Sequence, residues 1–321
     1  MTQRTLTLQT VEGPRRRVVP RLRRLDGGAA RAGASPLPLN VLLEGLERRG
    51  KKFLKRLKEA AQAGVRDTAS AVHDLRTASR HLLAVLEGLK RFVAGKAVRR
   101  PRRRIEKLLD RLGPVRDVTA QREMLQRIGS RNAIVHSLAS ELAARDRRMA
   151  RKARRRLGDV PVRRVRRDLR RLARTARGRH ASDADERRRA RDSARRALER
   201  LREARAAVDP NDSKTLHHMR IALKRFRYLM EELRPFFPGV PARDLATLHQ
   251  LQTSLGDLHD LDTLTATIAQ HLEKRAPARA SEAAPALQHM EERHAEILLS
   301  CLRALEPVLR PWEHLLIASG Q

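Results

Sequence analysis

Aromatic side chains are scarce in this sequence. Its 321 residues include one Trp, one Tyr and five Phe, a share of 2%. Proteins that bind single-stranded nucleic acid or RNA loops stack the bases on aromatic rings. The scarcity therefore argues against both of these binding modes.

Cysteine and long apolar runs are nearly absent as well. The single cysteine, Cys301, excludes an intramolecular disulfide and a cysteine-rich zinc site. No apolar run approaches the roughly 18 residues of a membrane-spanning helix. The N-terminal stretch MTQRTLTLQTVEG also lacks the apolar centre of a secretion signal. We therefore expect a soluble, cytoplasmic protein without a membrane span.

Acidic residues are too few to balance the basic ones. Lys and Arg number 71 against 37 Asp and Glu, which gives a formal net charge of +34. Such an excess destabilises the compact state by self-repulsion unless a polyanion neutralises it. Nucleic acid, an anionic membrane surface and a polyphosphate polymer are the natural partners. Only 11 of the cations are Lys, and Arg binds phosphate oxygens in a bidentate manner, although a GC-rich genome would produce the same bias.

The N-terminal residues 1–37 have the composition of a flexible basic tail. Arg-rich stretches are interrupted by Pro, and a Gly/Ala/Pro/Ser segment follows them. Such a tail either adds to polyanion binding or is a poorly ordered extension. In both cases its deletion should leave the melting temperature nearly unchanged.

From residue 38 onward the sequence is typical of α-helices. Leu, Ala, Arg and Glu recur with a period of 3.6 residues, and the alternation typical of strands is almost absent. The sequence therefore predicts an all-α fold. Glycine and proline residues predict breaks between helices at Gly95, Pro101, Gly113-Pro114, 158–161, Gly178, Asp209-Pro210, 238–241, Pro277 and Pro307.

Two motifs occur twice, in the same order and at nearly the same spacing. VHDLR (72–76) aligns with LHHMR (216–220), and LLDRLGPVRDV (108–118) aligns with LQTSLGDLHDL (251–261). The first motif precedes the second by about 40 residues in both halves. This pattern predicts a duplicated multi-helix unit.

On a helical wheel, the first motif of each half separates cations from apolar residues. His73, Arg76 and Arg80 fall within an arc of about 60°, opposite a stripe of Leu, Val and Ala. In the second half the shared arc contains His217, Arg220, Lys224 and Arg227. A single basic stripe is usually a solvated face. Two such stripes brought together by a twofold would concentrate repelling charges, which is tolerable mainly when an anion bridges them.

The H-x-x-R-x-x-x-R/K pattern, followed in each half by Leu-Gly-x-Val/Leu-x-Asp, resembles the CHAD family of conserved histidine α-helical domains. The resemblance covers about residues 38–310. It implies two four-helix bundles related by pseudo-twofold symmetry, with repeats at about 38–180 and 181–310 and a C-terminal end at 311–321. It also implies a basic surface or pore between the bundles that binds inorganic polyphosphate, and an association with polyphosphate granules.

Matched to the family pattern, the polyphosphate-binding candidates are His73, Arg76, Arg80, Arg116, His217, Arg220, Lys224 and Arg227. His259 takes the place that Arg116 has in the first half. Asp117 and Asp260 are either helix caps or carboxylates that hold the arginines in place. His81 and Leu82 occupy positions where the family often has further Arg.

Three functions remain open at this stage. The leading hypothesis is a polyphosphate-binding module without catalysis, cofactor or metal. The second is a basic protein that binds nucleic acid non-specifically, because a charge of +34 attracts any polyanion. The third is a phosphoryl-transfer enzyme using His73 or His217, but neither D-x-D nor a Gly-rich phosphate loop accompanies them. A metal site at His73, His217 and His218 is disfavoured because neighbouring Arg would repel a cation.

Overall fold

The computed structural model describes residues 36–65, 67–128, 133–179, 181–237, 239–275, 277 and 280–317. Within these ranges every regular element is helical, which confirms the predicted all-α class. The predicted tail falls almost entirely outside the described residues. The helices are α1 (Pro38–Gln62), α2 (Thr68–Leu89), α3 (Gly95–Ile128), α4 (Ala133–Gly158), α5 (Val162–Arg177), α6 (Asp183–Ala206), α7 (Ser213–Leu233), the 3₁₀ helix η1 (Arg234–Phe236), α8 (Ala242–Arg275) and α9 (Ala280–Ile317).

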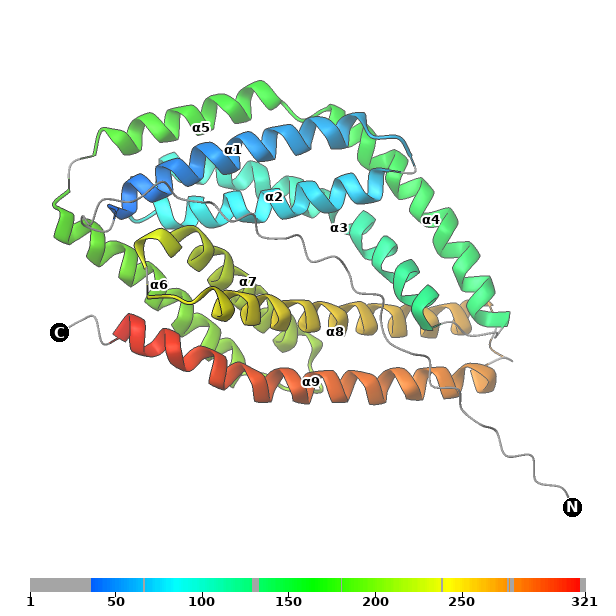
Figure 1. The fold of residues 1–321 in the computed structure, drawn as a ribbon. Helices are drawn as coiled ribbons and strands as arrows, with labels where there is room; N and C mark the ends of the chain where they lie inside the picture. Colours follow the sequence, from blue (N-terminus) through cyan, green and yellow to red (C-terminus); the bar gives the residue numbers. More distant parts are fainter. Residues whose placement is uncertain are drawn as a thin grey trace, which may run out of the picture. The chain divides into compact units, whose positions relative to one another are not determined.

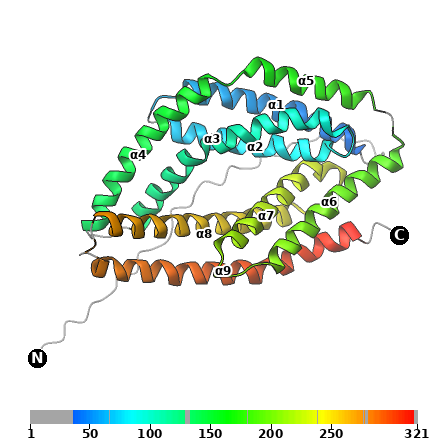
Figure 2. The same ribbon diagram turned by 180° about the vertical axis from the view of Figure 1, so that it is seen from behind.

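Most consecutive helices pack against each other, in two series. Helices α1 to α4 form one series of neighbours, and α6 to α9 form the other (Figure 1). The largest contacts that join the series are those of α2 with α7 and of α3 with α8, and α1 also contacts α6 and α7. Figure 2 shows α5 beside α1 on the outside of the first series. The two helices that carry the His-x-x-Arg pattern, α2 and α7, therefore lie against each other.

Two hydrophobic cores hold these helices together. The main core contains Leu, Val, Phe and Met side chains, and every α-helix named above contributes to it. In it the rings of Phe226 and Trp312 meet edge to face at 5.4 Å. Helices α1 and α2 approach so closely that a Cβ on Gly88 would lie 2.7 Å from Leu42. The smaller core joins α3, α4, α8 and α9 through residues such as Val118 and Leu261.

Three of the predicted breaks are wrong. Pro101 and Pro114 lie inside the continuous helix α3, and Pro307 lies inside α9. A proline removes one backbone hydrogen bond and strains the preceding turn, but apolar packing on both sides can hold the helix together. Here Ile105, Leu112 and neighbouring residues of α3 are fully or almost fully buried, so the helix continues through both prolines.

The packed region also extends past the predicted boundary at residue 310. Helix α9 continues to Ile317, and Trp312 and Leu316 are buried in the main core. Burying a Trp removes a large apolar area from water, which stabilises this last turn. Within the described residues, none of the helices is long and apolar enough to cross a membrane.

Candidate anion-binding site

Five cations on α2 and on its two neighbours α3 and α7 lie close enough to act on one another electrostatically. Arg76 and Arg80 come from α2, Arg116 from α3, and Arg220 and Lys224 from α7. We call these five residues the cationic cluster. Their charges repel one another: Arg80, Arg116 and Arg220 all act on Arg76, and all four guanidinium groups act on Lys224. The cluster thus unites residues of α2 and α7 that are 140 or more positions apart in the sequence.

Burial and mutual repulsion lower the pKa values of four members of the cluster, Arg76, Arg80, Arg220 and Lys224. Desolvation is the largest cause in each case, since it penalises the charged form. It lowers the pKa of Arg76 and of Arg220 to about 10, with repulsion from Arg80 as the next cause. The pKa of Lys224 falls to about 6, because the four arginines add to the cost of its burial. Unlike Arg, a Lys that is buried beside other cations can lose its proton near neutral pH.

Two carboxylates partly balance these charges. The Nη2 atom of Arg116 donates to Oδ2 of Asp260 at 2.9 Å, which links α3 to α8. Asp117 interacts with Arg76, Arg116 and Arg220, although its own pKa is raised, first by desolvation. Both aspartates lie inside long helices, so neither is a helix cap. Their placement agrees with the alternative role, in which they hold the arginines in place.

A pocket of about 430 Å³ lies beside the cluster, at the beginning of α7. It is lined by Ser213, Lys214, His217, His218, His259, Asp262 and Thr263. The rings of His217 and His259 are 5.8 Å apart. Burial and the charge of Arg220 lower the pKa of both histidines, that of His259 to about 4. The imidazoles of His217 and His259 are therefore mainly neutral at pH 7.

Two of the predicted site residues belong neither to the cluster nor to the lining of the pocket. His73 is exposed on α2, one turn before Arg76, at the position that corresponds to His217 on α7. Arg227 is buried, with only 5% of its surface exposed, and contacts other groups than the cluster. Its Nε atom donates to Oε1 of Gln252 at 3.0 Å, and its Nη1 atom pairs with Glu231.

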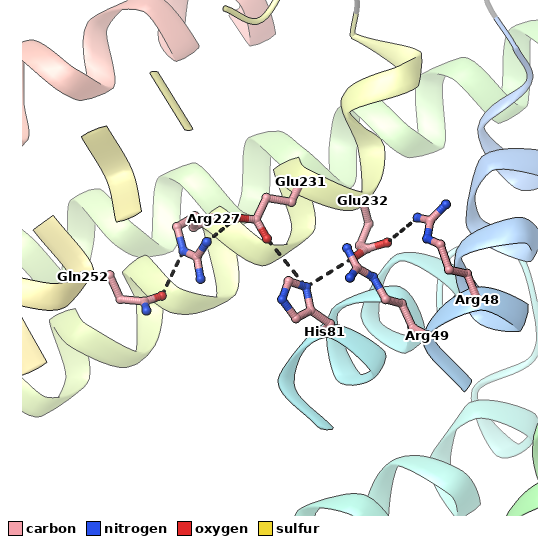
Figure 3. Close-up of polar contacts among 7 residues, drawn as sticks. All are labelled: Arg48, Arg49, His81, Arg227, Glu231, Glu232 and Gln252. Atoms are coloured by element: carbon pink, nitrogen blue, oxygen red, sulfur yellow. Dashed lines mark hydrogen bonds and ion pairs between the residues drawn. The ribbon is translucent and has the colours of Figure 1, made fainter. Parts of the chain in front are cut away.

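Figure 3 shows that Arg227 belongs to a separate polar network across α1, α2, α7 and α8. The centre of this network is Glu232, whose side chain is 1% exposed. Its carboxylate pairs with Arg48 at 3.2 Å and with Arg49 at 2.6 Å. His81 lies between Glu231 and Glu232, with its Nδ1 atom 3.6 Å and 3.4 Å from their nearest oxygens.

Sequence reasoning missed this network and several residues of the pocket. One sequence feature indicated the network: position 81 carries His where the family often has a further Arg. In the structure the ring of His81 faces two carboxylates of α7. The partners lie on three other helices, and periodicity on one helix does not identify them. Asp262 and Thr263 were missed for the same reason, since they reach the pocket from α8.

The chain is thus an all-helical protein that gathers cations from both halves of its sequence. The family model of the CHAD domain matches residues 48–269 of the sequence. This match covers well over half of the chain, so the protein belongs to the CHAD family. This confirms the resemblance seen in the sequence motifs.

Two solved structures are similar in fold. The CHAD domain from the plant Ricinus communis superposes with a TM-score of 0.60 at 18% identity, covering 91% of this chain and 95% of that one. PptA from Streptomyces chartreusis superposes with a TM-score of 0.63 at 18% identity, covering 86% and 100%. No curated protein matches the sequence.

Proposed function

We propose that this protein binds inorganic polyphosphate at the cationic cluster, has no catalytic activity of its own, and associates with polyphosphate granules. The observation that carries the proposal is a cluster of five cations, of which Arg76, Arg80, Arg220 and Lys224 are desolvated. A protein tolerates such a cluster poorly when it is empty, because burial and repulsion both disfavour the charged forms. A bound polyanion removes both penalties. The family resemblance points to polyphosphate as that polyanion.

The chemistry of the cluster suits a chain of phosphates. Each interior unit of polyphosphate carries one negative charge, and charge-assisted bonds from guanidinium groups to phosphate oxygens are short and strong. Arg76 and Arg80 are one turn apart on α2, as are Arg220 and Lys224 on α7. Cations spaced by a helical turn, about 5.4 Å, can contact successive phosphate groups of a linear polyanion. Nothing in this arrangement needs a base or a sugar.

Binding without turnover fits the groups that surround the cluster. Phosphoryl transfer needs carboxylates that hold metal ions or a nucleophile beside the phosphate. Asp260 is engaged with Arg116, and His217 faces Arg220 and Lys224, whose charges repel a metal ion. We therefore propose that the histidines bind the anion and do not attack it.

We further propose that the domain is a duplication of two four-helix bundles related by a pseudo-twofold. Helices α3 and α8 both have 34 residues, and α2 and α7 have 22 and 21. The corresponding segments 108–118 and 251–261 lie on the α3 and α8 pair, where Arg116 meets Asp260. This arrangement supports a shared axis between the halves.

Non-specific nucleic-acid binding is the second candidate, and helix α5 favours it. All eight of its arginines are exposed, and none forms an ion pair within the described part of the chain. A basic surface of this kind attracts any polyanion and loses affinity steeply with added salt.

Competition separates the two functions. We expect polyphosphate of defined length to displace a labelled DNA duplex at a phosphate concentration at least about tenfold lower than unlabelled duplex does. The reason is that the cluster side chains are half-buried, which favours contact with a narrow chain over contact with a wide duplex. Fluorescence anisotropy at several salt concentrations measures both competitors. Equal displacement at every salt concentration would favour the nucleic-acid function.

Asp260 provides a further prediction about affinity. In the empty site its carboxylate pairs with Arg116 and competes with an incoming phosphate. The Asp260→Asn variant should therefore bind polyphosphate several-fold more tightly and melt at a lower temperature, because Arg116 loses its counter-charge. Titration calorimetry and thermal denaturation measure the two effects. Weaker binding in this variant would show that Asp260 orients Arg116 for the ligand.

A further inference from the structure

Lys224 occupies an unusual position in the cationic cluster. Its four strongest electrostatic neighbours are all guanidinium groups: Arg220 on its own helix, Arg76 and Arg80 on α2, and Arg116 on α3. Its side chain is half-buried, and its ammonium has no carboxylate ion-pair partner within the described residues. Arg116, by contrast, has Asp260.

A lysine in such surroundings has one way to relieve the repulsion. Its intrinsic pKa of about 10.4 is low enough for the amine to lose its proton, whereas the arginines stay charged. Desolvation and the four guanidinium groups lower its pKa to about 6. At pH 7 to 9 the empty site therefore contains a neutral amine among four positive charges.

A polyanion reverses this situation. Phosphate groups among the guanidinium groups replace repulsion by attraction, and the charged ammonium becomes the favoured form again. On the basis of the proposed function, we propose that the site takes up a proton at Lys224 whenever polyphosphate binds. Binding is then coupled to pH, and the affinity of the site rises as the solution becomes more acidic.

Other titratable groups face the same space and define the pH window of the effect. They are Asp117 on α3, His217 and Tyr228 on α7, and His259 and Asp260 on α8. Burial lowers the pKa of both histidines, so in the empty site they gain protons only on the acid side of neutrality. A bound anion raises their pKa values as well, so the loss of uptake in the Lys224 variants is what assigns the proton to Lys224.

The sign of the coupling follows from linkage. A base whose pKa is low in the free site and higher in the complex binds a proton on complex formation at every pH between the two values. Over that interval the association constant falls by up to about tenfold for each unit of rising pH, for one coupled proton. Below pH 6 the lysine is already charged in the empty site, and its contribution to the slope disappears.

Calorimetry of the full chain tests the proposal. Polyphosphate of one defined length is titrated at pH 8 in Tris and in HEPES, buffers with different heats of ionisation. The difference between the observed heats gives the number of protons taken up. We expect close to one per site in the wild type, with an affinity that decreases from pH 7 to pH 9.

The matched variant is Lys224→Arg, whose guanidinium group is charged in the empty and in the occupied site and cannot release a proton. It should lose the proton uptake and most of the dependence of affinity on pH between 7 and 9. Lys90→Arg makes the same chemical change at an exposed lysine at the end of α2 and should keep both. If Lys224→Arg does not fold, Lys224→Met removes the titrating group without adding charge and should also lose the uptake.

The outcomes separate this inference from the function on which it rests. Tight binding with equal heats in both buffers would overturn the proton coupling and leave polyphosphate binding intact. Undiminished uptake in Lys224→Arg would overturn the assignment to Lys224. No binding of polyphosphate in either buffer would overturn the proposed function and the coupling with it.

Discussion

Replacing Arg76 and Arg220 together by Ala is expected to weaken polyphosphate binding about 100-fold or more. Each charge-assisted bond between a guanidinium group and a phosphate contributes roughly 1.5–3 kcal/mol when it is well formed. The two residues come from α2 and α7 and reach one cluster, where each is largely desolvated. Their contacts with the ligand are therefore poorly screened by water and salt.

The same double variant should be as stable as the wild type, or more stable. In the empty protein, both residues repel Arg80 and Arg116. Removing them relieves that repulsion, although the hydrogen bond from Arg76 Nη1 to the carbonyl oxygen of Leu109, at 3.0 Å, is lost. Anisotropy with labelled polyphosphate and thermal denaturation together measure the two effects.

The control removes the same charge elsewhere. Arg166 and Arg170 are exposed on α5, four residues apart, and neither forms an ion pair within the described residues. Replacing both by Ala should weaken binding much less, because a distant exposed charge contributes only to the general field. Equal losses in the two double variants would mean that diffuse attraction, and not the cluster, holds the polyanion.

The second large effect concerns stability. Glu232→Gln should destabilise the protein by about 3 kcal/mol, since breaking a buried ion pair leaves its partner uncompensated. The carboxylate of Glu232 is almost completely buried and contacts Arg48, Arg49 and His81 from two other helices. In a domain of this size the melting temperature should fall by about 5–10 °C.

Binding should be nearly unaffected by Glu232→Gln, because the network around Glu232 is separate from the cationic cluster. Arg227→Gln should behave in the same way, with lower stability and unchanged affinity, since Arg227 contacts Glu231 and Gln252. The control is Glu47→Gln, which removes an exposed pair with Lys51 on α1 and should leave the melting temperature unchanged. A loss of affinity in Arg227→Gln at full stability would return Arg227 to the binding site.

Much of the architecture could be predicted from local sequence patterns. Helical periodicity predicted the all-α class, because an apolar stripe with period 3.6 can be buried only by a helix. The two aligned motifs predicted that α2 and α7 would carry equivalent cations, and the structure brings Arg76, Arg80, Arg220 and Lys224 together. Patterns within one helix were sufficient for these conclusions.

Only the tertiary structure decided how each helix continues and what each side chain meets. Pro101, Pro114 and Pro307 looked like helix ends, yet packing on both sides keeps α3 and α9 continuous. On the wheel Arg227 shares the face of Arg220, but it lies about two turns further along α7, roughly 10 Å away. At that position along α7, the side chain of Arg227 contacts Glu231 and Gln252 and not the cluster. The sequence determined on which face of its helix each side chain lies. The packing of the other helices determined which charged or polar groups that side chain contacts.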